Sequence, residues 1–484
     1  MTDGTAPAEA TASLETVARE WTRSGITGFG GPPAHIALLR KLVVERERWM
    51  DHHAFEDANA ACSLLPGPSS TQLAIFCAYR VAGWPGAIVG GLGFIVPAVI
   101  LILALSLVFL SGSPPDWIRG AGASAGAAVA AVAVRAGGDL LGPSFAKARH
   151  EGGALVRWAV YAVAGGVAAA TIGPWLVLVL IGCGLLELLI RRASREGAAA
   201  LLAPLLALPR AGLRDAMPLA AVASTGSVAD LVWMAFKVGA LSFGGGFVIV
   251  PLMQGDAVHA YHWMSNSEFL NAVALGQVTP GPVVATVAAV GYGAYGIGGG
   301  LLAALVAFLP SFSFILLGGG RFERLRGNLF ARAFLAGAGP AAIGAILGSA
   351  VPLAGALTEF WQFAVLGCAA VALLGLRFAV VPVLLSAGAV GAVVALAGGP
   401  LPVAVGSATP DARASEAGAG SACVASARGR VGLAPRAKGR GRVGLAPGQG
   451  TGHVGPAPGR RHPPAGRYLS TKMRHPSLEF SEQP

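Results

Sequence analysis

The stretch from Gly25 to Pro68 occurs twice in this chain. It returns at residues 239–282 without a gap, so that each residue aligns with the one 214 positions later. Both copies contain Phe-Gly-Gly near the start and end on Pro-Gly-Pro. The identical pairs in between include Phe29/Phe243, Gly30/Gly244, Gly31/Gly245, Trp49/Trp263, Met50/Met264 and Phe55/Phe269. A chain with 70 Gly and 32 Pro contains many short chance matches. Identities held at one fixed spacing instead indicate internal duplication.

The composition places the duplicated stretch in a membrane protein. Hydrophobic residues make up 54% of the chain and charged residues 12%, whereas a soluble domain carries about 25% charged residues. The apolar runs are long enough to cross a bilayer, and they lie at 86–110, 154–190 (two spans with a turn at Gly173-Pro174), 228–250, 283–318, 334–352 and 360–399. With weaker candidates included, we expect about ten to twelve spans. The predicted fold class is an all-α, polytopic integral membrane bundle of two homologous halves.

Shifts in composition divide the chain into five parts. These are an amphipathic N-terminal segment (1–24), a first repeat (25–190), a basic connector (191–227), a second repeat (228–399) and a Gly/Ala/Pro/Arg-rich tail (400–484). The N-terminus shows no cleavable signal peptide. From Asp411 onward, twelve Arg or Lys and four acids account for most of the net charge of +11. We expect this low-complexity tail to be disordered. Read-through of GC-rich sequence and a lipid-attracted tail remain equal alternatives, and no nucleic-acid partner is predicted.

The loop charges of the two copies differ in a way that bears on orientation. Residues 40–48 carry four Arg or Lys, and the aligned residues 254–262 carry no basic group apart from titratable His. Because Arg and Lys accumulate in cytoplasmic loops, the two copies are expected to face opposite sides of the membrane. Such inverted repeats hold substrate near the midplane, at broken helices. Parallel halves with divergent loops remain the alternative.

The Gly-rich and Pro-Gly-Pro motifs would each interrupt a helix inside an apolar segment. A half-helix that begins at such a break presents unpaired N–H groups and the positive end of its dipole. This is an anion site that needs no formal charge. The alternative is that the motifs and nearby polar groups only cap and pack helices. The recurrence of both breaks in both copies favours binding, because breaks within lipid are costly.

Two cations in apolar segments support an anion as the substrate. Arg80 follows an apolar stretch and Lys237 precedes the second Gly motif, and charges within the membrane are usually functional. Snorkelling of Arg80 to the interface is the alternative reading. Arg135, Asp139, Glu187 and Arg377 are expected at span ends. The predicted substrate-binding residues are Gly30, Gly31, Pro66, Gly67, Pro68, Gln72, Arg80, Lys237, Gly244, Gly245, Gln277, Pro280, Gly281 and Pro282.

The sequence contains no hydrolytic or redox motif, no P-loop and no dinucleotide fingerprint. The five cysteines have no metal-ligand spacing. We therefore expect no enzyme activity, no cofactor and no bound metal.

In these motifs the chain resembles the chromate ion transporter family in its long-chain, two-domain form. The resemblance covers about residues 15–399 and leaves the tail unmatched, and Gly246 replaces the proline of the first Gly motif. It implies export of chromate across the bacterial inner membrane, conferring chromate resistance, with sulfate as a mimic and proton coupling as the expected energy source. Export of another small anion or of an amino acid, or a non-transport membrane role, remains open. So does the oligomeric state, for which a homodimer is one candidate.

Overall fold

The structure is a computed structural model that describes residues 12–63, 65–110, 114–149, 154–171, 176–196, 226–242, 246–318 and 328–402. Every regular element in these ranges is a helix, so the predicted all-α fold is confirmed. The predicted tail lies outside the described residues, apart from its first three positions.

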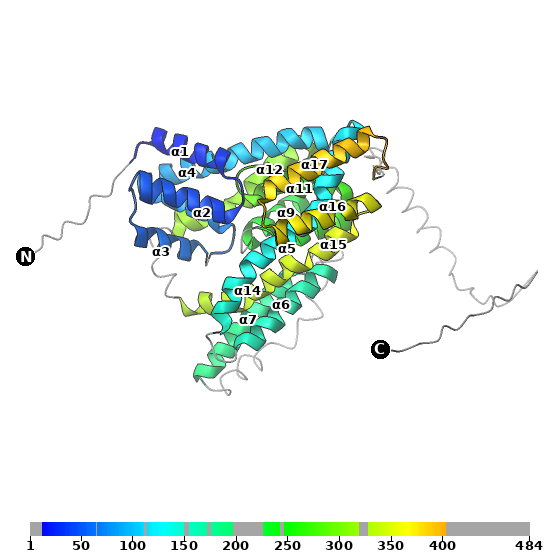
Figure 1. Ribbon diagram of the computed structural model, residues 1–484. Helices are drawn as coiled ribbons and strands as arrows, with labels where there is room; N and C mark the ends of the chain where they lie inside the picture. The colour runs from blue at the N-terminus through cyan, green and yellow to red at the C-terminus, as the bar shows by residue number, and fades with distance from the viewer. Residues whose placement is uncertain are drawn as a thin grey trace, which may run out of the picture. The chain divides into compact units, whose positions relative to one another are not determined.

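The helices of the first copy include one π-helix, and those of the second copy include two π-helices and one 3₁₀-helix (Figure 1). The first copy contains α1 (Leu14–Thr27), α2 (Pro32–Arg40), the π-helix η1 (Lys41–Arg46), α3 (His52–Cys62), α4 (Ser69–Phe109), α5 (Asp116–Arg149), α6 (Ala154–Thr171) and α7 (Leu176–Glu196). The second copy contains α9 (Val228–Leu241), α10 (Ile249–Gln254), the π-helix η5 (Gly255–Ala260), α11 (Asn266–Val278), the 3₁₀-helix η6 (Val283–Ala285), α12 (Thr286–Gly318), α14 (Leu329–Gly348), α15 (Ala350–Gly355), α16 (Phe360–Ala370), the π-helix η8 (Val371–Gly375) and α17 (Val380–Leu396).

The duplication extends to the backbone conformation. The bounds of α1 and α9 are 214 residues apart, as are those of η1 and η5. The equivalent π-helices η1 and η5 are both followed by a residue with positive φ, which is Arg48 at 53° after η1 and His262 at 52° after η5. The N-caps are equivalent too, since Ser13 and Ser227 each accept from a backbone amide of their own helix. The structural repeat therefore begins near Ser13, earlier than the repeat of identical residues.

Both long helices kink at the same place. Gly83 in α4 has φ 62° and ψ −155°, and Gly296 in α12 has φ 63° and ψ −154°. L-residues with a side chain rarely adopt this conformation, which explains a glycine at each kink. Helices α4 and α12 consequently consist of two helical segments each.

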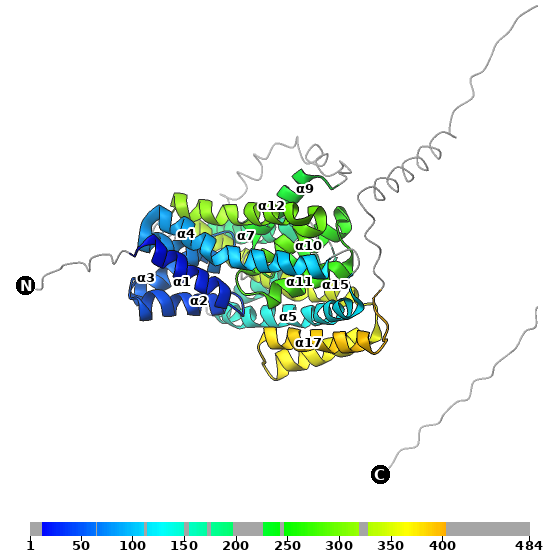
Figure 2. The same ribbon diagram turned by 90° about the horizontal axis from the view of Figure 1, so that it is seen from above.

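Helices α4 and α12 pack side by side at the centre, with α1 on α4 and α9 on α12 (Figure 2). Gly91 lies against Phe312, whereas Leu103, later in α4, lies against Gly300, earlier in α12. The two helices therefore run antiparallel. Because they are equivalent helices of the two copies and both are long enough to span a membrane, the copies are inverted relative to each other. This agrees with the predicted inverted repeat.

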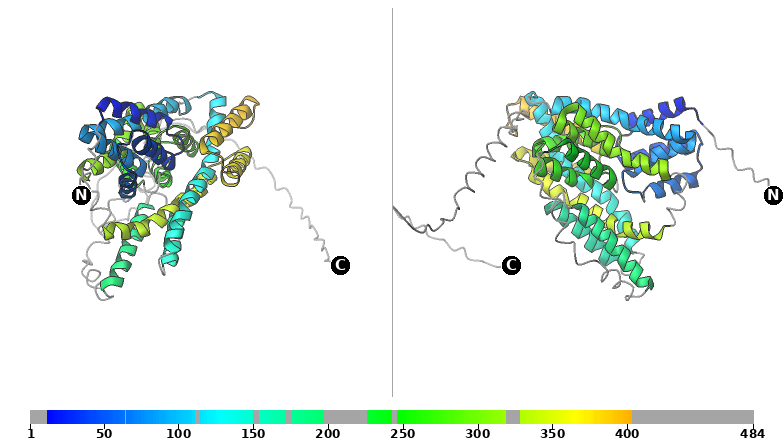
Figure 3. Two further views of the ribbon diagram at one scale, coloured as in Figure 1. Left: turned by 60° about the vertical axis from the view of Figure 1, so that its left-hand side comes forward. Right: turned by 180° about the vertical axis from the view of Figure 1, so that it is seen from behind.

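The outer helices are exchanged between the copies. Helix α5 of the first copy packs on α16 and α17 of the second, and α14 of the second packs on α6 and α7 of the first (Figures 1 and 3). Glycines permit this close contact. A Cβ at Gly165 would lie 1.9 Å from the Ala341 carbonyl oxygen, and one at Gly344 would lie 1.7 Å from that of Ala162. Small residues at helix crossings are typical of membrane bundles.

Five helices among the described residues are long and apolar enough to cross a membrane. They are Ser69–Phe109, Asp116–Arg149, Ala154–Thr171, Val283–Gly318 and Leu329–Gly355. This is fewer than the ten to twelve spans expected. The apolar run 228–250 includes only the 14-residue α9 and the start of the short α10, and the run 360–399 divides into the shorter apolar helices Phe360–Gly375 and Val380–Leu396.

The expected N-terminal amphipathic segment forms α1, which packs on the long helix α4. Val17 and Trp21 are fully buried there, and the Trp21 indole Nε1 donates to the Ala74 carbonyl at 2.8 Å. Trp21 also stacks on Trp49 with ring centroids 6.2 Å apart. Helix α1 is thus fixed into the bundle as the counterpart of α9.

Candidate functional site

A cavity of about 350 Å³ lies where the helix breaks of both copies meet. The first copy contributes the Gly-rich break, the first Pro-Gly-Pro turn and one face of α5. The second contributes the end of α11 and the second Pro-Gly-Pro turn. The lining residues that are polar or glycine are Gly30, Gly31, Ser63, Gly67, Ser69, Arg135, Asp139, Gly276, Gln277, Thr279 and Gly281.

Each Pro-Gly-Pro turn contacts the copy to which it does not belong. The Gly281 backbone N–H donates to the Gly28 carbonyl at 2.9 Å, and a Cβ at Gly281 would lie 2.7 Å from the Ala98 Cβ. On the other side, a Cβ at Gly67 would lie 3.2 Å from the Gly239 carbonyl oxygen. Since Gly239 is the equivalent of Gly25, each turn inserts beside the same helix of the opposite copy.

A buried histidine supports the first Gly-rich break. His35 is fully buried, and its Nε2 lies 2.9 Å from the Gly28 carbonyl oxygen. A carbonyl only accepts, so Nε2 carries the proton. The ring Nδ1 lies 3.3 Å from the Ser70 hydroxyl at the start of α4. The Gly28 carbonyl therefore accepts one hydrogen bond from His35 of its own copy and one from the Gly281 amide of the other copy. Through Ser70, His35 also links the Gly-rich break to the start of α4, directly after the first Pro-Gly-Pro turn.

The helix starts at the cavity differ in what they offer an anion. Helix α4 begins at Ser69, directly after Pro68, so that its first-turn amides lack a partner within the helix. Helix α2 begins with Pro32 and Pro33, which have no N–H to donate. The sequence-based expectation that each break supplies a donor terminus is thus corrected for α2. The amide donors at this side are those of the α4 terminus.

Two glutamines brace or line the turns. The Gln72 Nε2 donates to the Pro66 carbonyl at 2.7 Å, which closes the first turn. The Gln277 side chain is only 9% exposed and lines the cavity, and its Nε2 has no hydrogen-bond partner among the described residues. A buried unpaired donor costs about 1–3 kcal/mol. Gln277 is thus an unpaired donor in the lining, and its role in binding remains a prediction.

Replacement of Gln277 by leucine is expected to leave the unliganded protein as stable as before or slightly more stable, because it removes the unpaired donor. It should reduce the rise in melting temperature that sulfate produces in the purified full-length protein. Ser124→Ala is the matched control, since the Ser124 hydroxyl is also buried without a partner among the described residues but lies outside the cavity. An undiminished sulfate response in Gln277→Leu would contradict a binding role for Gln277.

Arg135 and Asp139 are the charged side chains among the residues that line the cavity. The Arg135 Nε donates to both carboxylate oxygens of Asp139, at 3.0 and 2.9 Å, and its Nη1 donates to the Leu373 carbonyl in η8 at 2.5 Å. The sequence places this pair at a span end, as an interfacial feature. Its place in the cavity depends on the packing of α5 against the second copy, for which the sequence gives no signal.

Lys237, predicted to bind substrate, has another partner. Its Nζ lies 2.6 Å from the Asp256 carboxylate in η5, and the two side chains are 13% and 4% exposed. Burial raises the pKa of Asp256, and the Lys237 charge opposes that rise. Lys237 is not among the residues lining the cavity. In the first copy, Glu20 of α1 pairs with Arg46 of η1, so each copy ties this helix to its π-helix by an ion pair of opposite polarity.

The remaining predicted residues are placed as follows. Arg80 is exposed and does not line the cavity. Pro66, Pro68, Pro280 and Pro282 flank the two lining glycines Gly67 and Gly281. Gly244 and Gly245 lie outside the described residues. The cavity therefore brings together Gly30, Gly31, Gly67, Gln277 and Gly281, and the binding roles of Arg80 and Lys237 remain predictions.

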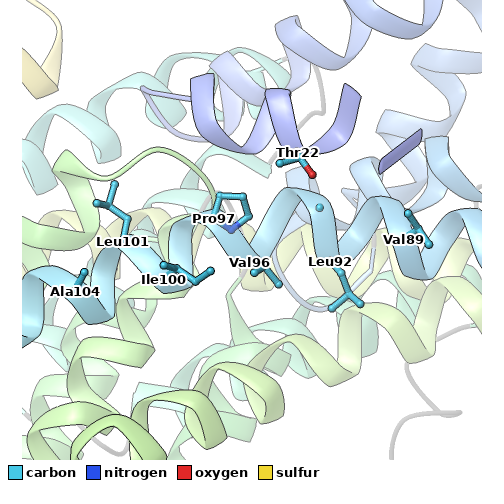
Figure 4. A pocket seen from close by; sticks show the side chains of 9 residues that line it. Thr22, Val89, Leu92, Val96, Pro97, Ile100, Leu101 and Ala104 are labelled. Atoms are coloured by element: carbon cyan, nitrogen blue, oxygen red, sulfur yellow. The ribbon is translucent and has the colours of Figure 1, made fainter. Parts of the chain in front are cut away.

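A second hollow runs along the outer face of α4 (Figure 4). It has a volume of about 670 Å³ and is lined by Val89, Leu92, Val96, Ile100 and other apolar residues, with Thr22 as its polar side chain. One hydroxyl gives an oxyanion almost nothing to bind. The cavity between the copies is therefore the better candidate site.

Comparison with known proteins gives one consistent family. The family model described as Chromate transporter matches residues 16–188 and 229–394. A chromate transport protein of Cupriavidus metallidurans is 30% identical over 357 residues, which cover 71% of this chain and 83% of that protein. One of Pseudomonas aeruginosa is 32% identical over 348 residues, covering 69% and 80%. No solved structure matches. The chain therefore belongs to the chromate transporter family.

Proposed function

We propose that this protein is a secondary active transporter that exports chromate, a tetrahedral oxyanion resembling sulfate, across the bacterial inner membrane and so confers chromate resistance. The observation that carries the proposal is the meeting of Gly30, Gly31, Gly67 and Gly281 in one cavity. These four glycines, an unpaired Gln277 amide and the Arg135 guanidinium line this space. These are the groups that replace the hydration of an oxyanion.

The inverted copies support transport through alternating access. In inverted-repeat transporters the site stays near the midplane while one copy rocks against the other. The cavity lies between the copies, where such a movement changes its access. The relatives named as chromate transport proteins in two bacteria are consistent with this substrate.

The membrane potential favours export of a dianion. Each charge is worth about 2.3 kcal/mol per 100 mV, so an inside-negative potential favours outward movement of a dianion by about 4.6 kcal/mol per 100 mV. A proton gradient adds to this only if proton and anion movements are coupled. The two driving forces therefore need separate tests.

Uptake of radiolabelled chromate into inverted membrane vesicles tests the function. We expect uptake that depends on the protein and is inhibited by excess sulfate. A potential that is positive inside the vesicle should accelerate it, and an imposed pH gradient alone should do so if protons are coupled. Absence of protein-dependent chromate uptake under every gradient would refute the proposal. Uptake that sulfate does not affect would indicate a different solute class, such as an amino acid.

A further inference from the structure

The charged pair in the cavity presents a problem for an anion-binding site. Arg135 is the cation that a dianion would approach, but its Nε is already bound to both oxygens of Asp139. The Arg135 and Asp139 side chains are 27% and 62% exposed, so solvent and solute reach both. The other lining residues carry no charge. The formal charge of the empty cavity lining is thus zero when Asp139 is ionised.

A single-charged anion gains little in such a cavity. It can replace the carboxylate at the guanidinium, but one unit negative charge then substitutes for another, and the displaced Asp139 stays close enough to repel it. For a double-charged anion of the same shape, the attraction to Arg135 and the repulsion by the displaced Asp139 both about double, while the cost of breaking the Arg135–Asp139 pair stays the same. Because Arg135 is the nearer charge, the attraction grows by more than the repulsion. The exchange therefore favours the dianion.

We propose that Arg135 binds the transported oxyanion and that Asp139 is its resident counter-ion, which a dianion displaces and a monoanion does not. Asp139 is then a specificity-determining residue, because the cost of displacing it is the same for every anion and the attraction of a single charge to Arg135 is too weak to offset it. This inference rests on the proposed function and adds the basis on which abundant monoanions are excluded. Gln277 and the backbone amides recognise the oxygens of the ligand, and the Arg135–Asp139 pair selects its charge.

Perchlorate is the suitable probe, because it is tetrahedral like sulfate but carries one charge. The experiment measures binding of radiolabelled sulfate to the purified full chain, with perchlorate as competitor and the sulfate far below its dissociation constant in each variant, so that half-displacement reports the affinity for perchlorate. In the unchanged protein, perchlorate should compete weakly. In Asp139→Asn the cavity gains one positive charge, and the perchlorate concentration needed for half-displacement should fall on the order of tenfold or more. Asp139→Glu should keep the original selectivity.

Asp116→Asn is the matched control. Asp116 lies on the same helix and pairs with Arg119 at 3.1 Å, but neither residue lines the cavity. In this variant, the perchlorate concentration needed for half-displacement of sulfate should equal that of the unchanged protein. Asp139→Ala provides a second neutral variant with a different shape, and it should behave as Asp139→Asn does.

The outcomes separate the two proposals. One outcome is that the unchanged protein binds sulfate, but the perchlorate concentration for half-displacement is the same in Asp139→Asn and Asp139→Ala. This outcome overturns the charge-selection role alone. Failure of both neutral variants to fold overturns it as well, since Asp139 is then a structural residue. If the unchanged protein neither binds sulfate nor transports chromate, the proposed function fails first.

Discussion

Replacement of Gly281 by alanine is expected to prevent the two copies from assembling into a stable bundle. Gly281 has φ 100°, a conformation that costs an L-residue about 1–2 kcal/mol. The added Cβ would lie 2.7 Å from the Ala98 Cβ of the other copy, and such overpacking costs about 1–3 kcal/mol more. The shift would also disturb the bond from the Gly281 amide to the Gly28 carbonyl. A total loss of about 2–5 kcal/mol should appear as a lower melting temperature and a smaller monodisperse fraction after detergent extraction.

Gly298→Ala is the control for this prediction. Gly298 lies on α12, the long helix that follows the Gly281 turn, and a Cβ there would meet nothing within 4 Å. Alanine in a helix is more stable than glycine by about 0.5–1 kcal/mol, so this variant should be as stable as the unchanged protein or more so. Equal stability of Gly281→Ala and Gly298→Ala would show that the crossing of the turns is not a tight contact.

Lys237→Met is expected to destabilise the protein strongly. The change leaves the Asp256 carboxylate, whose side chain is 4% exposed, without its partner at 2.6 Å. Removal of one member of a buried ion pair typically costs about 3–5 kcal/mol, and replacement of both members by apolar residues is often neutral. Lys237→Met should therefore lower the melting temperature, and the double variant Lys237→Met/Asp256→Leu should recover most of the loss.

Glu56→Gln is the control for the ion pair. Glu56 pairs with Arg40 at 3.3 Å, with the two side chains 43% and 40% exposed, and exposed pairs contribute about 0–1 kcal/mol. Its melting temperature should hardly change. If Lys237→Met keeps full stability but loses chromate transport, Lys237 acts on the substrate, as predicted from sequence, and its pairing with Asp256 is secondary.

The sequence predicted the fold well where the chain must break. Glycine and proline have narrow backbone consequences, so Gly30, Gly31 and the two Pro-Gly-Pro motifs marked interruptions that the structure contains. The loop charges at 40–48 favoured inversion, and the antiparallel contact of Gly91 with Phe312 and of Leu103 with Gly300 agrees with it. These features depend on local chemistry, which the sequence carries directly.

The sequence was less informative where tertiary packing decides. When α1 is aligned with α9, Gly25/Gly239 is the one identical pair. The two helices still occupy equivalent places, because an apolar face fits the same groove with different side chains. The partner of Lys237 lies 19 residues away, and only the intervening break brings it near. Arg135 and Asp139 have the spacing of an ordinary helical ion pair, so their place in the cavity depends on which helices surround α5.

The crossed turns also constrain how the protein can move. Gly67 contacts the helix of the opposite copy, and Gly281 does the same in return, so neither copy can tilt without displacing a turn that belongs to the other. We expect the entrance facing one compartment to narrow in the same step in which the entrance facing the other widens. A continuous leak through the middle of the protein would require both turns to withdraw together, which the reciprocal contact opposes.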